Sequence, residues 1–418
     1  MILIAFVALN YRVYDGYFQD DELDNLAWAP STPLHDYAVA LLKPTFDTAN
    51  FRPVGHIYFT LMGRAFGLDF PPYMTPILAI HLLNALLLFL LLRKLGIEQW
   101  SALAGTAFFA LSATAFDAYT KPMYVFDLLC ATFCLASILL FAYRRWVLSF
   151  VAFWCAYKAK ELAVMLPAVL LVYEYWLGKR RFAILIPFFL AALSFGIQGL
   201  LFNPNKDNEY TFRFTPEALA ATIPFYAQRF LFFRYSAFLL LPLALIRDRR
   251  VWFGLIAAFC FVSTLLFLPG RLFEAYAYLP LACATIALAA AASRLNPLWI
   301  AVALILWLPW NIRHQHRELK ERLGLDDEAA AYVEQLNAWV AKHPATRTYI
   351  YYDIPRGYHH WGITAAWNIA HHAAGMPAMW HDWDSVAPAL ARETVALGYW
   401  KWDGKTGRLT VLIHSPGT

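Results

Sequence analysis

Charged side chains are scarce in this chain: only 15% of its 418 residues are Asp, Glu, Lys or Arg, whereas 60% are hydrophobic. Soluble globular domains carry charges at about 25% of their positions. The scarcity excludes an ordinary soluble globule and predicts an all-α polytopic membrane protein. The net charge of +5 comes from short Lys and Arg clusters between apolar runs, so it does not indicate a nucleic-acid partner.

Cysteine and the common catalytic motifs are also sparse. All five cysteines lie inside apolar runs, so we expect packing roles and no disulfide framework. The chain has no Gly-rich phosphate loop, no Gly-x-Ser-x-Gly elbow and no His-Glu-x-x-His motif. The spacing of the C-terminal histidines matches no zinc-ligand pattern, and we predict no metal at His359, His360, His371, His372 and His381.

The first apolar segment is unusually short. Residues 1–9 are apolar, but a spanning helix needs about 20 residues. A signal peptide is not expected, because the segment lacks a basic start and a small-residue cleavage site. Either residues 2–14 form a strained short span, or the first half of this helix is missing from the sequence; we expect the second.

Long apolar runs dominate the sequence up to residue 312. Together with the N-terminal segment they predict about eleven transmembrane helices by the hydropathy criterion. The runs are centred on residues 74–93, 101–118, 122–142, 146–157, 160–177, 182–202, 224–246, 251–269, 272–292 and 296–312.

Basic residues fall in every second connection between these runs. The clusters are Arg93–Lys94, Arg144–Arg145, Lys179–Arg181, Arg247 with Arg249 and Arg250, and Arg294. The positive-inside rule places these connections in the cytoplasm. The intervening connections, including the long first loop over residues 10–73, are then expected on the outer face of a bacterial inner or plasma membrane.

The composition changes after residue 312. We predict a transmembrane domain over residues 1–312 and a small soluble extracytoplasmic α/β domain over residues 313–418. Its expected elements are helices at 313–342 and 362–374, a strand at 348–353, and a hairpin of strands 393–402 and 408–414 around the turn 403–407. Within the first outer loop, residues 51–66 are amphipathic, and Pro53 suits the first position of an interfacial helix.

The first outer loop concentrates acidic side chains. Asp20, Asp21, Glu22 and Asp24 place four carboxylates within five residues. Charges beside a bilayer are costly unless they face water, a partner or a substrate. Asp20, Asp21 and Asp24 are therefore candidate catalytic acids with Glu22 in support; the alternative is a solvated loop that is merely acidic.

Basic side chains on the same predicted face form the second candidate group. Lys158 and Lys160 interrupt an apolar stretch against the positive-inside trend, so we expect an anion to meet at least one of them. Glu161 is an alternative, internal partner that would make part of this group structural. Arg52 and Arg271 join the lysines as candidate phosphate ligands, with His56, Glu161 and Glu274 in support. Other polar residues expected on this face are Asp117, Lys121, Asp127, Arg213, Gln228 and Arg229.

Carboxylates and cations on one face suit transfer to a hydroxyl with release of a phosphate. A carboxylate can take the proton from an attacking hydroxyl. Arg and Lys can stabilise the charge that develops on a phosphate leaving group, and Arg can grip two of its oxygens.

Four stretches resemble one known superfamily. Phe18–Asp21, with paired aspartates in the first outer loop, resembles the GT-C glycosyltransferases, polytopic enzymes that use polyprenyl-phosphate sugars. The protein O-mannosyltransferase-like branch is similar in three further places: Arg52-Pro53 followed by His81-x-x-Asn84; Lys160-Glu161 with Pro167; and Arg271 with Tyr278-Leu279-Pro280. Together these cover about residues 15–290.

The resemblance implies an inverting glycosyl transfer on the outer membrane face. Asp20 or Asp21 matches the family's catalytic loop acid; Lys160, Arg52 and Arg271 match candidate ligands of the donor phosphate; Glu161 matches the acid after the family's lysine. A divalent metal at the Asp20/Asp21 loop is left open, because branches of the superfamily differ in needing one. The implied partners are a polyprenyl-phosphate sugar, membrane lipid and an acceptor that is a protein, lipid or glycan. The rival hypotheses are a transporter or flippase of a lipid-linked sugar and a non-catalytic membrane scaffold.

Overall fold

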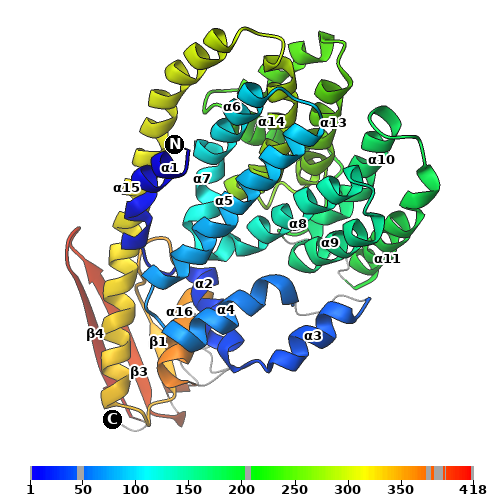
Figure 1. Cartoon of the computed structure of the whole chain (residues 1–418). Coiled ribbons are helices and arrows are strands. Elements are labelled where there is room, and N and C mark those ends of the chain that lie inside the picture. The colour runs from blue at the N-terminus through cyan, green and yellow to red at the C-terminus, as the bar shows by residue number, and fades with distance from the viewer. Residues whose placement is uncertain are drawn as a thin grey trace. The chain divides into compact units, whose positions relative to one another are not determined.

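The computed structural model describes residues 2–44, 51–202, 209–372, 378–380, 389–390 and 392–415, and helices dominate them (Figure 1). The α-helices are α1 Ile2–Asn10, α2 Asp20–Trp28, α3 Leu34–Leu42, α4 Pro53–Phe66, α5 Pro71–Lys94, α6 Gln99–Leu111, α7 Ala113–Thr120, α8 Val125–Ala142, α9 Trp146–Ala159, α10 Leu166–Trp176, α11 Ile186–Phe202, α12 Pro216–Arg229, α13 Arg249–Ser263, α14 Tyr278–Ala292, α15 Pro297–Lys342 and α16 His360–His371. The strands are β1 Thr348–Tyr351, β2 Ala378–Trp380, β3 Val395–Trp402 and β4 Gly407–His414.

Several helices are suited to a bilayer. In the described part of the chain, four are long and apolar enough to cross a membrane: Pro71–Lys94, Pro122–Ala142, Arg249–Phe267 and Glu274–Ala292. The number of candidate spans rises to five if the bent pair Gln99–Leu111 and Ala113–Thr120 counts as one span. Other predicted spans correspond to shorter apolar helices, such as Trp146–Ala159 and Ser236–Leu245. The membrane character is thus confirmed, whereas the expected number of about eleven spans stays a prediction.

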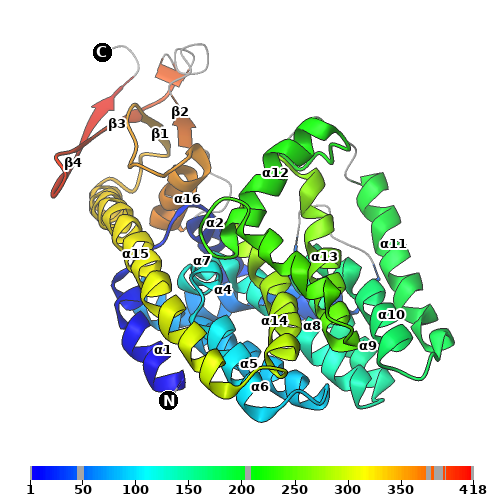
Figure 2. The ribbon, with the colours of Figure 1, turned by 90° about the horizontal axis from the view of Figure 1, so that it is seen from above.

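The described chain divides into two compact units. The first consists of Met1–Asn10, Leu34–Gly55 and Thr75–Gln315, and the second of Tyr11–Pro33, His56–Met74 and His316–Thr418. Helix α15 is continuous from the first unit into the second, as Figure 2 shows. The second unit therefore contains parts of the first loop as well as the C-terminal segment.

Small residues bring the apolar helices of the first unit together. Gly254 on α13 faces α14 so closely that a Cβ atom there would collide with the backbone of Cys283 and Ala287. Helices in lipid associate mainly by such close packing, because lipid tails are as apolar as their side chains. Any larger residue at 254 would force α13 away from α14.

A buried polar group also ties these helices. Asn84 on α5 donates to the Tyr278 hydroxyl at 3.1 Å and to the Leu128 carbonyl at 3.0 Å. The Tyr278 hydroxyl then donates to Nδ1 of His81 at 2.8 Å, and His81 Nε2 donates to the carbonyl of Ala110 at 3.0 Å. Three residues of the family-like motifs therefore bind one another and hold α5, α6, α8 and α14 in register.

The second unit carries a four-stranded sheet in the order β2-β1-β3-β4, with β3 and β4 antiparallel and the other pairs parallel. The predicted turn forms as expected: Asp403 accepts hydrogen bonds from the backbone of Lys405 and Thr406 at 2.8 and 2.7 Å, and Gly404 has φ +98°. These bonds lower the pKa of Asp403 to about 2. The strand expected at 348–353 is confirmed as β1, which ends at Tyr351, and the helix opening at Pro53 is confirmed as α4. The helix expected at 362–374 is confirmed as α16 up to His371, and residues 373–374 lie outside the described residues.

Candidate functional site

The Lys160–Glu161 dipeptide lies where α9 ends and binds two different partners. Lys160 is the C-terminal cap of α9 and has extended backbone, so its side chain leaves the helix axis. Its Nζ lies 2.6 Å from both carboxylate oxygens of Asp127 on α8, and both side chains are largely buried. The sequence suggested Glu161 as an alternative partner of this lysine. That interpretation is wrong, because Asp127 forms the ion pair with Lys160.

Glu161 instead binds Arg52. The guanidinium of Arg52 grips the carboxylate with two bonds, Nε to Oε1 at 2.8 Å and Nη2 to Oε2 at 3.0 Å. Arg52 immediately precedes α4, whose first residue, Pro53, needs no backbone N–H and sets the helical φ. The planar fork matches a carboxylate and would match a phosphate equally well.

Tyr276 connects the third predicted cation to this group. The ring of Tyr276 lies 4.0 Å from Lys160 Nζ, a cation–π distance, and its hydroxyl accepts a 3.3 Å hydrogen bond from Arg271. We refer to Arg52, Asp127, Lys160, Glu161, Arg271 and Tyr276 as the basic cluster. Three of the four predicted phosphate ligands thus come together within the first unit.

Other predicted residues of the first unit lie in separate contacts. Lys158 is buried on α9, with Nζ 5.6 Å from the ring of Trp154. Glu274 pairs with Arg229 of α12 at 2.6 Å. Neither interaction involves a member of the basic cluster.

The acidic stretch of the second unit is the start of a helix, which corrects its interpretation as a loop. Helix α2 begins at Asp20, and Gln19 and Glu22 form a reciprocal capping box, with the Gln19 N–H donating to Glu22 at 2.6 Å. Carboxylates in a first turn are stabilised by the helix dipole. Glu22 is buried and forms this capping bond, whereas Asp24 is exposed.

Two residues at the start of α16 hold the first two aspartates. Asp20 accepts hydrogen bonds from the His359 backbone N–H at 3.0 and 3.1 Å, and Nδ1 of His359 lies 2.6 Å from its Oδ2. The indole Nε1 of Trp361 donates to Oδ1 of Asp21 at 3.1 Å. Gly362 permits this approach, because a Cβ atom there would overlap the Asp20 carboxylate.

The environment of the two aspartates differs. Asp20 is buried, which raises the pKa of its carboxyl, while the hydrogen bonds and charge of His359 lower that pKa in part. Asp21 is half-buried, and its Oδ2 accepts no hydrogen bond from the residues that the structure describes. Asp21 therefore keeps an oxygen open for a proton.

The remaining residues predicted near this helix have structural contacts. His56 is buried against Trp28, with ring centroids 4.9 Å apart. Among the described residues, no three His, Cys, Asp or Glu side chains are placed to hold a metal ion. His371 binds the carbonyl of Thr346 at 2.9 Å, and His381 lies outside the described residues.

Sequence reasoning missed Tyr276, His359 and Trp361 as parts of the site. His359 is 339 positions from Asp20 and Trp361 is 340 positions from Asp21, so no local pattern connects them. The capping box Gln19-x-x-Glu22 was the one local signal that could have revealed α2.

Three solved structures resemble this chain along nearly its whole length. The arabinofuranosyltransferase AftD from Mycobacteria aligns with 95% of this chain and 35% of its own, at 16% identity and a TM-score of 0.58. This chain thus spans about a third of the length of AftD. ArnT from Cupriavidus metallidurans bound to undecaprenyl phosphate aligns with 99% of this chain and 98% of its own, at 14% identity and a TM-score of 0.56.

The apo state of the same ArnT aligns with 100% of this chain and 99% of its own, at 14% identity and a TM-score of 0.55. AftD and ArnT are both GT-C glycosyltransferases. This chain has the GT-C fold. No family profile matches its sequence, and no curated protein matches it. At these identities the likeness establishes the fold alone, and the resemblance to the O-mannosyltransferase-like branch stays a prediction.

Proposed function

We propose that this protein is an integral membrane glycosyltransferase that moves a sugar from a polyprenyl-phosphate carrier to an acceptor hydroxyl on the outer membrane face. The observation that carries the proposal is the basic cluster in a chain of GT-C fold, one of whose structural neighbours, ArnT, was solved with undecaprenyl phosphate bound. Transport of a lipid-linked sugar has no comparable support.

The basic cluster supplies the donor site. Arg52 and Lys160 are held by Glu161 and Asp127, so each cation is oriented before the donor arrives. The phosphate gains negative charge as its bond to the sugar breaks. Cations fixed in a poorly solvated site stabilise that charge without reorganising at the moment of reaction.

Asp21 is the general base of this proposal. Asp20 already accepts the hydrogen bonds of His359 through both oxygens, whereas Asp21 has an open Oδ2. Asp21 takes the proton of the acceptor hydroxyl while the hydroxyl oxygen bonds to the anomeric carbon. The bond between that carbon and the phosphate oxygen breaks, and polyprenyl phosphate leaves from the opposite side, which inverts the configuration.

The test is a turnover assay with purified protein in nanodiscs and a panel of polyprenyl-phosphate sugars. Asp21→Asn should lower kcat by about 10²–10⁴-fold and leave donor binding intact, because a base acts on the transition state. Lys160→Met should weaken donor binding. Asp327→Asn, at an exposed acid of the same unit, is the matched control and should behave as wild type.

Two results would contradict parts of this mechanism. Loss of turnover in Asp20→Asn but not in Asp21→Asn would move the base to Asp20. Wild-type turnover in both variants would show that α2 is merely acidic, and the glycosyl-transfer proposal with an aspartate base would fall.

A further inference from the structure

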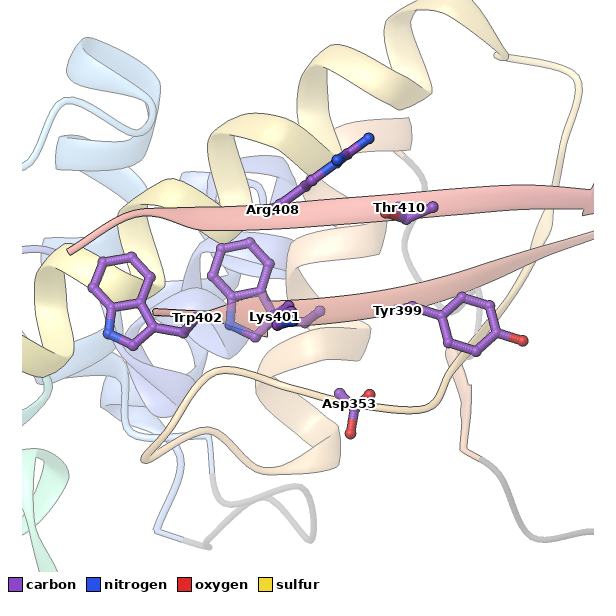
Figure 3. A pocket seen from close by; sticks show the side chains of 7 residues that line it. Asp353, Tyr399, Lys401, Trp402, Arg408 and Thr410 are labelled. Carbon is purple, nitrogen blue, oxygen red and sulfur yellow. The ribbon is translucent and has the colours of Figure 1, made fainter. Parts of the chain in front are cut away.

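The sheet of the second unit carries a cleft that has no role in the mechanism described above. Its volume is about 570 Å³, within the range of small-molecule sites. Figure 3 shows its side chains on β3, β4 and the loop that follows β1. The lining residues are Asp353, Tyr399, Trp400, Lys401, Trp402, Arg408 and Thr410.

Strand register gathers the polar lining on one face of the sheet. In the antiparallel pairing, Tyr399 lies opposite Thr410 and Lys401 lies opposite Arg408. Residues directly opposite each other share a face, and so do alternate residues of one strand. Trp400 faces the other way into the core, where its Nε1 donates to the buried Glu328 at 3.0 Å.

Two cations at the cleft, Lys401 and Arg408, repel each other when no ligand is bound. Lys401 and Arg408 are exposed like charges directly across two strands, an arrangement that destabilises a sheet. Within the described part of the chain, neither forms a salt bridge. An anion bound between them would remove the repulsion, and the Arg fork would grip a carboxylate or phosphate with two bonds.

An aromatic surface borders the cations. The rings of Tyr352 and Tyr399 stack in parallel, with centroids 4.7 Å apart and planes 1° apart. The negative face of an aromatic ring attracts the weakly positive C–H groups on the flat side of a sugar. Asp353 and Thr410, on either side in Figure 3, are suited to hydrogen bonds with sugar hydroxyls.

We propose that this cleft binds an acidic saccharide, with a carboxylate or phosphate between Lys401 and Arg408 and a sugar ring against Tyr399. The cleft belongs to the same compact unit as Asp21. Resting on the proposed function, the bound saccharide is the acceptor of the glycosyl transfer.

The test is isothermal titration of the full chain in nanodiscs with trigalacturonate and mannose 6-phosphate, against neutral maltotriose. Arg408→Gln and Tyr399→Ala should each weaken binding of the acidic sugar, Arg408→Gln by roughly 10–100-fold because a charge-assisted contact is lost. Lys405→Gln is the matched control: it removes a positive charge from the adjacent turn, outside the cleft lining, and should bind as wild type.

Several outcomes would overturn the inference. One is that neither acidic sugar binds. Another is that Lys405→Gln weakens binding of the acidic sugar as much as Arg408→Gln does. A third is that polyglutamate or a single-stranded oligonucleotide binds as tightly as the acidic sugars. Asp21→Asn tests the proposed function and leaves the saccharide cleft unchanged, so the two proposals can fail separately. Saccharide binding with no transfer in any donor assay would defeat the proposed function alone, whereas transfer that survives Arg408→Gln without saccharide binding would defeat this inference alone.

Discussion

Nδ1 of His359 lies 2.6 Å from Oδ2 of Asp20, and 339 positions of sequence separate the two residues. Together with the bond from Trp361 to Asp21, this contact makes the start of α16 the support of the acidic helix α2. The C-terminal segment is thus part of the architecture of the proposed catalytic helix, and it is more than an appended binding domain.

The Asp20–His359 contact predicts a specific pH dependence of stability. Burial raises the pKa of Asp20 above its ordinary value of 3.8, so the folded state keeps a proton that the unfolded state has released. The free energy of unfolding therefore falls as the pH rises through this window. His359→Phe removes groups that lower this pKa, which extends the fall to higher pH.

The measurement is the thermal unfolding midpoint of wild type and His359→Phe in detergent. We expect the gap between their midpoints to widen as the pH rises above the ordinary pKa of Asp20. His343→Phe, whose ring contacts the Trp339 carbonyl, is the control and should show no such trend. A gap that is constant with pH would mean that His359 does not set the ionisation of Asp20.

The Lys160–Asp127 pair predicts strong coupling between two buried charges. Removing one partner leaves the other charge buried and uncompensated, so Lys160→Met and Asp127→Leu should each cost about 3–5 kcal/mol. The double variant should cost much less than the sum, because no isolated charge remains. SDS-induced unfolding in mixed micelles measures all four members of the cycle; additive costs would show that the two charges do not interact.

Arg52→Lys should weaken use of the donor. The substitution keeps the charge but loses the planar fork that holds Glu161 through two bonds. We expect a higher KM for the polyprenyl-phosphate sugar, and Glu161→Gln should shift KM in the same direction. Arg64→Lys, on the same helix but bonded to the carbonyls of Pro30 and Thr32, is the control. An unchanged KM in Arg52→Lys would remove Arg52 from the donor site.

The alternating basic connections predict that residues 313–418 lie outside the cytoplasm. Alkaline phosphatase and a fluorescent reporter that matures only in the cytoplasm should be fused separately after Thr418. We expect an active phosphatase and a dark reporter. A bright reporter with inactive phosphatase would reverse the topology and place the acidic helix on the wrong face for the proposed reaction.

Local signals predicted the elements that local physics controls. The hairpin follows from Asp403-Gly404, whose side chain and positive φ build the turn, and α4 follows from Pro53 at its first position. The acidic stretch was assigned to a loop because its charges outweighed the capping pattern that begins α2.

The partners of the candidate residues could not be predicted in the same way. Lys160 and Glu161 are adjacent, which favoured pairing each with the other, but the backbone turns extended at Lys160 and sends their side chains to Asp127 and Arg52. Such choices depend on which helices pack together. The sequence named the charged residues of the basic cluster but missed Tyr276, and it did not specify how these groups combine.

The dependence of α2 on α16 also imposes a delay during biosynthesis, between synthesis of α2 and synthesis of its support. The acidic helix leaves the ribosome well before its support, because His359 and Trp361 follow 339 and 340 positions after their aspartates. At usual elongation rates that delay is roughly 17–70 s. Throughout it, the nascent protein carries apolar helices ready for the bilayer but an acidic helix without its support, so a chain that stops before residue 359 can enter the membrane without assembling the aspartates of its proposed site.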